Sequence, residues 1–82
     1  MNIEEMKEKL EKALQLDECI VTGENGHFKV IAVSDLFTPL TRVKKQQLIY
    51  AVFADEIATN AIHALTIKAL TPAEWQKQKY FI

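Results

Sequence analysis

The apolar positions of residues 3–14 recur at the spacing of a helix. Ile3, Met6, Leu10 and Leu14 form one stripe, and glutamate and lysine fill most of the remaining surface. Some of these charges stand four residues apart as glutamate–lysine pairs, which stabilise a helix. The pattern predicts an amphipathic helix of roughly three to four turns that packs on a sheet.

The next residues have the pattern of a β-hairpin. Cys19–Thr22 is short and rich in β-branched residues, and His27–Val33 alternates so that Phe28 and His27 fall on opposite faces. The turn Gly23–Gly26 separates the two predicted strands. Its G-x-x-G spacing also occurs in KH nucleic-acid domains, but there the loop joins two helices. Here it joins two strands, so we interpret it as a structural turn.

A longer helix is predicted from Thr41 to Ile57, after a connecting segment at residues 34–40. Apolar residues in its second half recur at helical spacing and should face the core. They are Leu48, Ile49, Val52, Phe53 and Ile57.

Residues 61–75 predict a strand followed directly by a helix. His63 stands at the beginning of the strand, in phase with its apolar residues, so we expect it on the packed face near the edge of the sheet. Thr71 and Glu74 have the spacing of a capping box. A last helix is therefore predicted over Pro72–Lys79, with Trp75 as its anchor in the core.

The predicted element order is α-β-β-α-β-α in a single domain of residues 1–82. Three strands covered by helices on one face make a small α+β fold. The pattern does not place the third strand in the sheet, although the helical crossover before it permits parallel pairing with a neighbour.

Composition and charge narrow the function classes. Residues 1–28 carry seven acidic and three basic side chains, whereas residues 29–82 carry four acidic and seven basic ones. A basic second part is compatible with an anionic partner and equally with a solvated mixed surface. No apolar run approaches the ~20 residues of a membrane span, and the acidic first residues do not resemble a signal peptide. We therefore expect a cytoplasmic protein that makes no membrane contact.

The residues give little support for an enzyme. The sequence has no phosphate-binding P-loop, no dinucleotide fingerprint and no H-E-x-x-H motif. Its one cysteine, Cys19, follows acidic residues that raise the pKa of a thiol rather than activate it. A metal site would need His63, His27 or ligands from a partner, because one cysteine cannot hold a metal alone.

The first turn of the second helix carries Arg42, Lys44 and Lys45. The helix dipole disfavours cations at this end by about 0.3–1 kcal/mol each. Such a turn suits a phosphate or a carboxylate, which gives a possible binding site for a partner or for nucleic acid. The alternative is that the long side chains bend back into solvent, and the sequence leaves both interpretations open.

Several segments resemble the BolA-like family. Ile62–Ile67 (IHALTI) and Leu70–Trp75 (LTPAEW) are similar to its C-terminal signature, and His27–Val30 and Arg42–Tyr50 match further upstream. In order and spacing these segments cover nearly the whole chain. The variant Lys44–Gln47 (KKQQ) resembles a small bacterial subgroup called YrbA or IbaG.

The resemblance implies a class II KH-like fold and a non-enzymatic adaptor. His63 falls on the histidine by which BolA-like proteins ligate a 2Fe–2S cluster shared with a monothiol glutaredoxin. The glutaredoxin cysteine and its bound glutathione supply other ligands, and the complex serves cluster trafficking or the sensing of iron and stress. The chain alone would hold no cluster, and it would be a monomer or a heterodimer with glutaredoxin.

The resemblance leaves the second ligand and an alternative function open. The family has a histidine or cysteine in the loop between the first two strands, but Gly23–Gly26 contains neither, so His27 is the substitute candidate. Family members have also been regarded as transcriptional regulators. Arg42, Lys44 and Lys45 would then bind DNA weakly and in a salt-sensitive manner.

Overall fold

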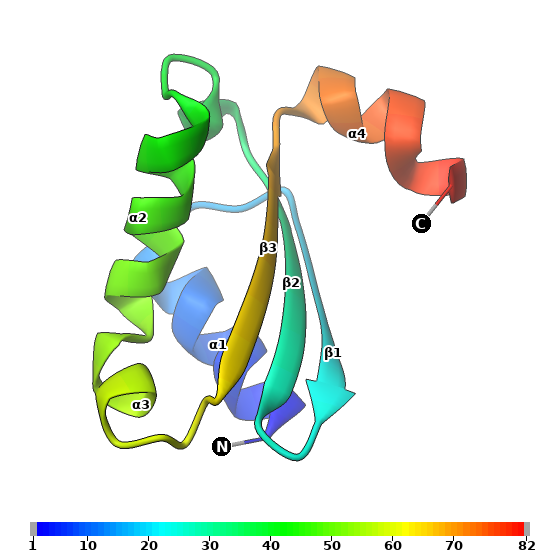
Figure 1. Cartoon of the computed structure of the whole chain (residues 1–82). Coiled ribbons are helices and arrows are strands. Elements are labelled where there is room, and N and C mark those ends of the chain that lie inside the picture. Colours follow the sequence, from blue (N-terminus) through cyan, green and yellow to red (C-terminus); the bar gives the residue numbers. More distant parts are fainter. Residues whose placement is uncertain (1, 82) are drawn as a thin grey trace.

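The computed structural model describes residues 2–81, with side chains described to residue 80. Three strands form one sheet in the order β1-β2-β3, namely β1 (Glu18–Glu24), β2 (His27–Val33) and β3 (Ala64–Leu70). Strand β1 is antiparallel to β2, whereas β3 is parallel to β2 (Figure 1). The predicted α+β class and element order are confirmed, and the helical crossover before β3 explains the parallel pairing.

The hairpin between β1 and β2 is tighter than the sequence predicted. Glu24 pairs with His27, so only Asn25 and Gly26 form the turn. Both have positive φ angles, 54° and 80°, as a two-residue turn of type I′ requires. Asn and Gly adopt these angles most readily, which explains why the strand continues through Gly23 instead of ending before it.

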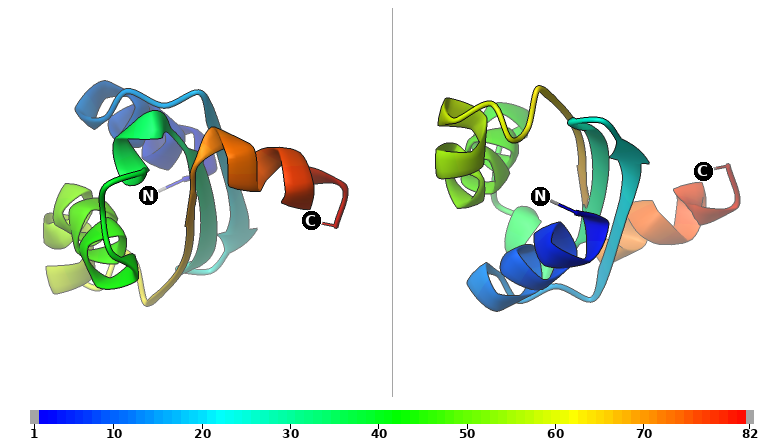
Figure 2. Two further views of the ribbon diagram at one scale, coloured as in Figure 1. Left: turned by 90° about the horizontal axis from the view of Figure 1, so that it is seen from above. Right: turned by 90° about the horizontal axis from the view of Figure 1, so that it is seen from below.

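The main core lies between one face of the sheet and two helices, α1 (Ile3–Ala13) and α2 (Arg42–Val52) (Figure 2). Met6 and Leu10 of α1 are fully buried there, as the amphipathic pattern predicted. Asn2 and Glu5 close a capping box at the start of α1, which fixes where the helix begins. Within residues 2–81, no helix has the length and apolar character needed to cross a membrane.

The prediction of one helix from Thr41 to Ile57 is wrong at Phe53. This residue leaves the helical conformation (φ −106°, ψ 17°), so α2 ends at Val52 and a short helix α3 (Ala54–Ala58) follows. The side chain of Phe53 is fully buried in the core. A break of one residue hardly disturbs the spacing of apolar positions, which is why the sequence pattern predicted one continuous helix.

The last helix, α4 (Pro72–Gln78), departs from the expectation that the helices share one face. It begins where β3 ends and lies on the side of the sheet away from α1 and α2 (Figure 2). Trp75 packs there against Ile31, Val33 and Leu70, a second apolar cluster separate from the main core. Trp75 is thus an anchor, as predicted, but for this smaller cluster.

An ion pair between Lys9 and Glu56 joins α1 to α3. The Nζ atom of Lys9 lies 2.7 and 2.8 Å from the two carboxylate oxygens of Glu56. The hydrogen bond from Lys9 lowers the pKa of Glu56 below its usual value. The pair therefore contributes stability when Glu56 is ionised, and this contribution is lost as pH falls through the lowered pKa.

We expect Glu56→Gln to lower the free energy of unfolding by about 0.5–1 kcal/mol at neutral pH. The difference from wild type should be complete above roughly pH 5, where an ordinary glutamate is ionised, and should shrink below roughly pH 4. Urea unfolding of both proteins at several pH values measures it. A difference that stays constant into acid would contradict the role of the ionised pair.

Candidate functional site

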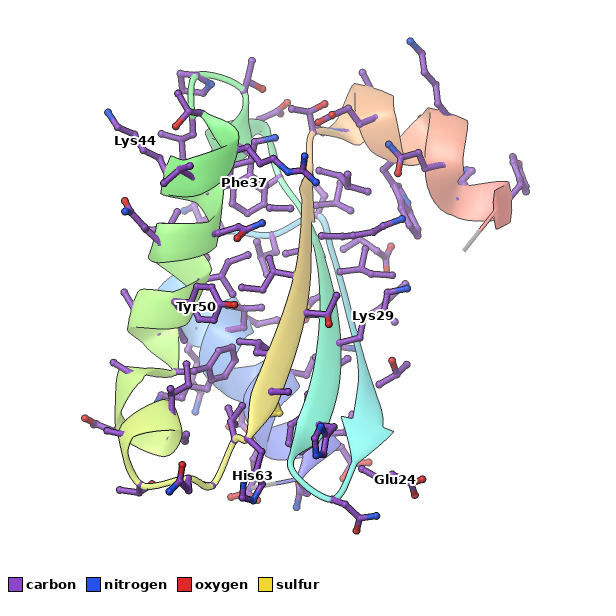
Figure 3. The ribbon with its side chains drawn as sticks, viewed as in Figure 1. Glu24, Lys29, Phe37, Lys44, Tyr50 and His63 are labelled. Carbon is purple, nitrogen blue, oxygen red and sulfur yellow. The ribbon has the colours of Figure 1, made fainter. Side chains whose placement is uncertain are left out.

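The two histidines predicted as metal ligands lie next to each other. The centroids of their imidazole rings are 6.0 Å apart, and the ring planes are inclined by 21°. Their meeting follows from the parallel pairing of β2 with β3, which sets His27 opposite Ala64 and so brings His63 to the hairpin turn. Figure 3 shows His63 at the lower end of the sheet, beyond the start of β3.

The backbone of the hairpin holds His63 in place. The carbonyl oxygen of Gly26 accepts hydrogen bonds from the amides of His63 and Ala64, at 2.7 and 3.1 Å. A Cβ atom on Gly26 would collide with Cδ2 of His63, so the imidazole ring rests against the glycine. Gly26 was not among the site residues predicted from the sequence. The sequence feature that points to it is the Asn25–Gly26 dipeptide of the turn.

The prediction that His63 lies on the packed face is wrong. Strand β3 starts one residue later, and His63 belongs to a bend in which its side chain is exposed. The buried residue at this point is Ile62, which is 2% exposed. His27 is also exposed, on the sheet face opposite the main core, as predicted. Both imidazoles are therefore accessible to a partner.

The histidine pair is a small donor set. Within residues 2–81, no group of three or more His, Cys, Asp or Glu side chains is arranged to hold a metal ion. Cys19 is 4% exposed and packs in the main core. Burial, together with the nearby Glu11, raises the pKa of its thiol to about 11, so a thiolate is not available there. The two imidazoles remain, and histidine is a common ligand for iron, zinc or copper.

The predicted basic turn lies at the other end of the molecule from the histidines, where Figure 3 labels Lys44. Thr41 caps the helix by accepting a hydrogen bond from the amide of Lys44, at 3.3 Å. Arg42 and Lys44 are exposed. Lys45 instead bends back over the sheet, and its Nζ donates to the carbonyl oxygen of Ala69 at 3.4 Å. The three cations therefore do not act as one exposed cluster.

Comparison with known proteins identifies the relatives of this fold. A family model described as "BolA-like protein" matches residues 3–74. The chain belongs to the BolA-like family. Acid stress protein IbaG of Escherichia coli strain K12 is 48% identical over 79 residues, which cover 96% of this chain and 94% of the relative.

Solved structures agree with this family membership. BolA1 from Arabidopsis thaliana matches 90% of this chain and 96% of its own, with a TM-score of 0.80 and 33% identity. The BolA domain of SufE1 from the same plant matches 88% of this chain and 93% of its own, with a TM-score of 0.76 and 39% identity. The BolA-like resemblance inferred from the sequence is thereby confirmed, together with its fold.

Proposed function

We propose that this BolA-like protein is a non-enzymatic adaptor that binds a monothiol glutaredoxin and shares a 2Fe–2S cluster with it. His63 is the ligand contributed by this chain, and His27 is the second candidate. The observation that carries the proposal is the exposed pair of imidazoles at one end of the sheet. The cluster is cargo of the complex, to be passed on or used for sensing iron or stress.

The donor set supports a shared cluster better than a metal site of this chain alone. Two imidazoles leave most of the coordination to a partner, and a glutaredoxin cysteine with its bound glutathione would supply thiolates. Histidine nitrogen in place of thiolate raises the potential of such a cluster. The backbone hydrogen bond from His63 to Gly26 fixes the position of the residue, and the imidazole ring rests against Gly26 before a partner binds.

The name of one relative is compatible with the sensing role. IbaG is described as an acid stress protein, and a stress function for this chain is part of the same proposal. The alternative of a DNA-binding regulator receives less support, because Lys45 is engaged with Ala69 and two exposed cations would give only weak binding.

Anaerobic cluster reconstitution tests the proposal. The protein is reconstituted alone and mixed with a monothiol glutaredoxin and glutathione, and visible absorption, circular dichroism and gel-filtration elution are recorded. We expect a new cluster spectrum in the mixture and co-elution of the two proteins. Separate elution, with the spectrum of the glutaredoxin unchanged by this protein, would refute the adaptor role.

A further inference from the structure

Strand β3 forms an open edge of the sheet. Within residues 2–81 it pairs with β2 on one side, and no further strand follows on the other. The amide of Ala64 and the carbonyl of Leu70 make hydrogen bonds toward the β2 side. Successive residues of a strand alternate, so Leu65, Ile67 and Ala69 direct their backbone N–H and C=O groups to the outer side. Such an edge can pair with another strand.

Two side chains of α2 cover part of this edge and leave a gap between them. The hydroxyl of Tyr50 donates to the carbonyl of Leu65 at 3.2 Å, and Lys45 donates to the carbonyl of Ala69. Ile67 lies between these contacts. Its outward N–H and C=O groups therefore stay available to an added strand, in the part of the chain that the structure describes.

The C-terminal half of this edge borders a basic hollow of about 350 Å³ between α2, β3 and α4. Arg42, Lys45 and Lys68 line it, against the single carboxylate of Glu74. The side chain of Lys45 is only 17% exposed, and its Nζ lies 3.9 Å from Oε1 of Glu74. The hollow thus has an excess of positive charge directly beside the backbone groups of the edge.

We infer that the outer edge of β3 binds an extended acidic segment of a partner protein as an added strand. Backbone pairing at Ile67 gives such a segment its hold, and an aspartate or glutamate of the segment occupies the hollow between Arg42 and Lys68. This surface is distinct from the proposed cluster site, because the histidines lie at the opposite end of β3. The inference therefore does not rest on the proposed function.

The charges favour an acidic protein segment over other occupants. A second copy of this chain would bring its own Arg42, Lys45 and Lys68 against the same positive edge. For a nucleic-acid strand, base stacking on aromatic rings is the usual anchor. The described residues that line the hollow include no aromatic ring.

Fluorescence anisotropy tests the inference with a labelled peptide of ten residues that alternates glutamate and valine and has blocked termini. We expect saturable binding that Arg42→Glu weakens by about tenfold or more, as for the loss of a close charge pair. Lys7→Glu, the same charge reversal at an exposed position on α1, should change the affinity by less than about twofold. His63→Ala should bind the peptide like wild type, which separates this surface from the cluster site.

A second peptide tests the strand pairing without altering the protein. It has the same sequence but N-methyl groups at alternate residues, so it keeps its charges and loses backbone donors. We expect this peptide to bind at least about tenfold more weakly. Equal binding of both peptides would overturn strand addition. Absence of binding by the unmethylated peptide, or saturable binding of a single-stranded ten-nucleotide DNA in its place, would overturn the inference as a whole.

Discussion

His63→Ala should abolish the cluster spectrum that appears when this protein is mixed with a monothiol glutaredoxin. The variant removes the imidazole of a residue whose backbone amide donates to the Gly26 carbonyl in an exposed bend. Among the described residues, no cysteine or histidine other than His27 lies exposed beside it. We expect the yield of mixed cluster complex to fall by at least about tenfold. Visible circular dichroism after anaerobic reconstitution measures this loss.

Two variants make the result specific to the position of the imidazole. His27→Ala should weaken the spectrum less than His63→Ala, because His27 is the second candidate. Gly26→Ala keeps both imidazoles but places a Cβ where the His63 ring lies, and it also strains a backbone with φ of 80°. It should alter the spectrum as well. An unchanged spectrum for His63→Ala, with native far-ultraviolet circular dichroism, would show that His63 is not a ligand.

Phe53→Ala should be the most destabilising of the substitutions considered. Phe53 is fully buried at the break between α2 and α3, so its loss leaves a cavity in the main core. Removing a buried phenylalanine costs about 3–5 kcal/mol. A small domain is stable by only about 5 kcal/mol or a little more, so most of the stability should be lost. Urea unfolding followed by circular dichroism measures the change.

The matched control for this prediction is Val43→Ala on α2. Val43 is 64% exposed, so the change should alter the free energy of unfolding by less than about 0.5 kcal/mol. If the midpoint of urea unfolding for Phe53→Ala is close to that of wild type, the Phe53 side chain does not anchor the core. The chain around it can then repack.

Local patterns in the sequence were sufficient for the order of strands and main helices, but not for the break between α2 and α3. Thr71 caps α4 through contacts with Glu74, three residues away, and the spacing of these two residues can be read directly from the sequence. The Lys44 and Arg42 side chains are exposed, which is compatible with both interpretations that the sequence left open. Lys45 follows neither, because its partner Ala69 lies on a distant strand.

The features that the sequence could not supply depend on contacts between distant residues. Helix α4 covers its side of the sheet because Trp75 packs against the apolar cluster around Ile31. The alternating pattern of β2 did not indicate that a helix would cover this face. The exposure of His63 follows from the start of β3 at Ala64, which the pairing with β2 decides. The alternation of faces holds only within a strand, so it does not place the side chain of a residue in the bend before the strand.

The parallel pairing of β2 and β3 also has a consequence for folding. A two-residue turn joins β1 to β2, whereas a long connection through α2 and α3 separates β2 from β3 in the sequence. Contacts across long loops cost more chain entropy and form more slowly. The histidine pair exists only once this late pairing is made. A ligand that binds both imidazoles would therefore hold the two ends of the crossover together and slow the local opening of β3.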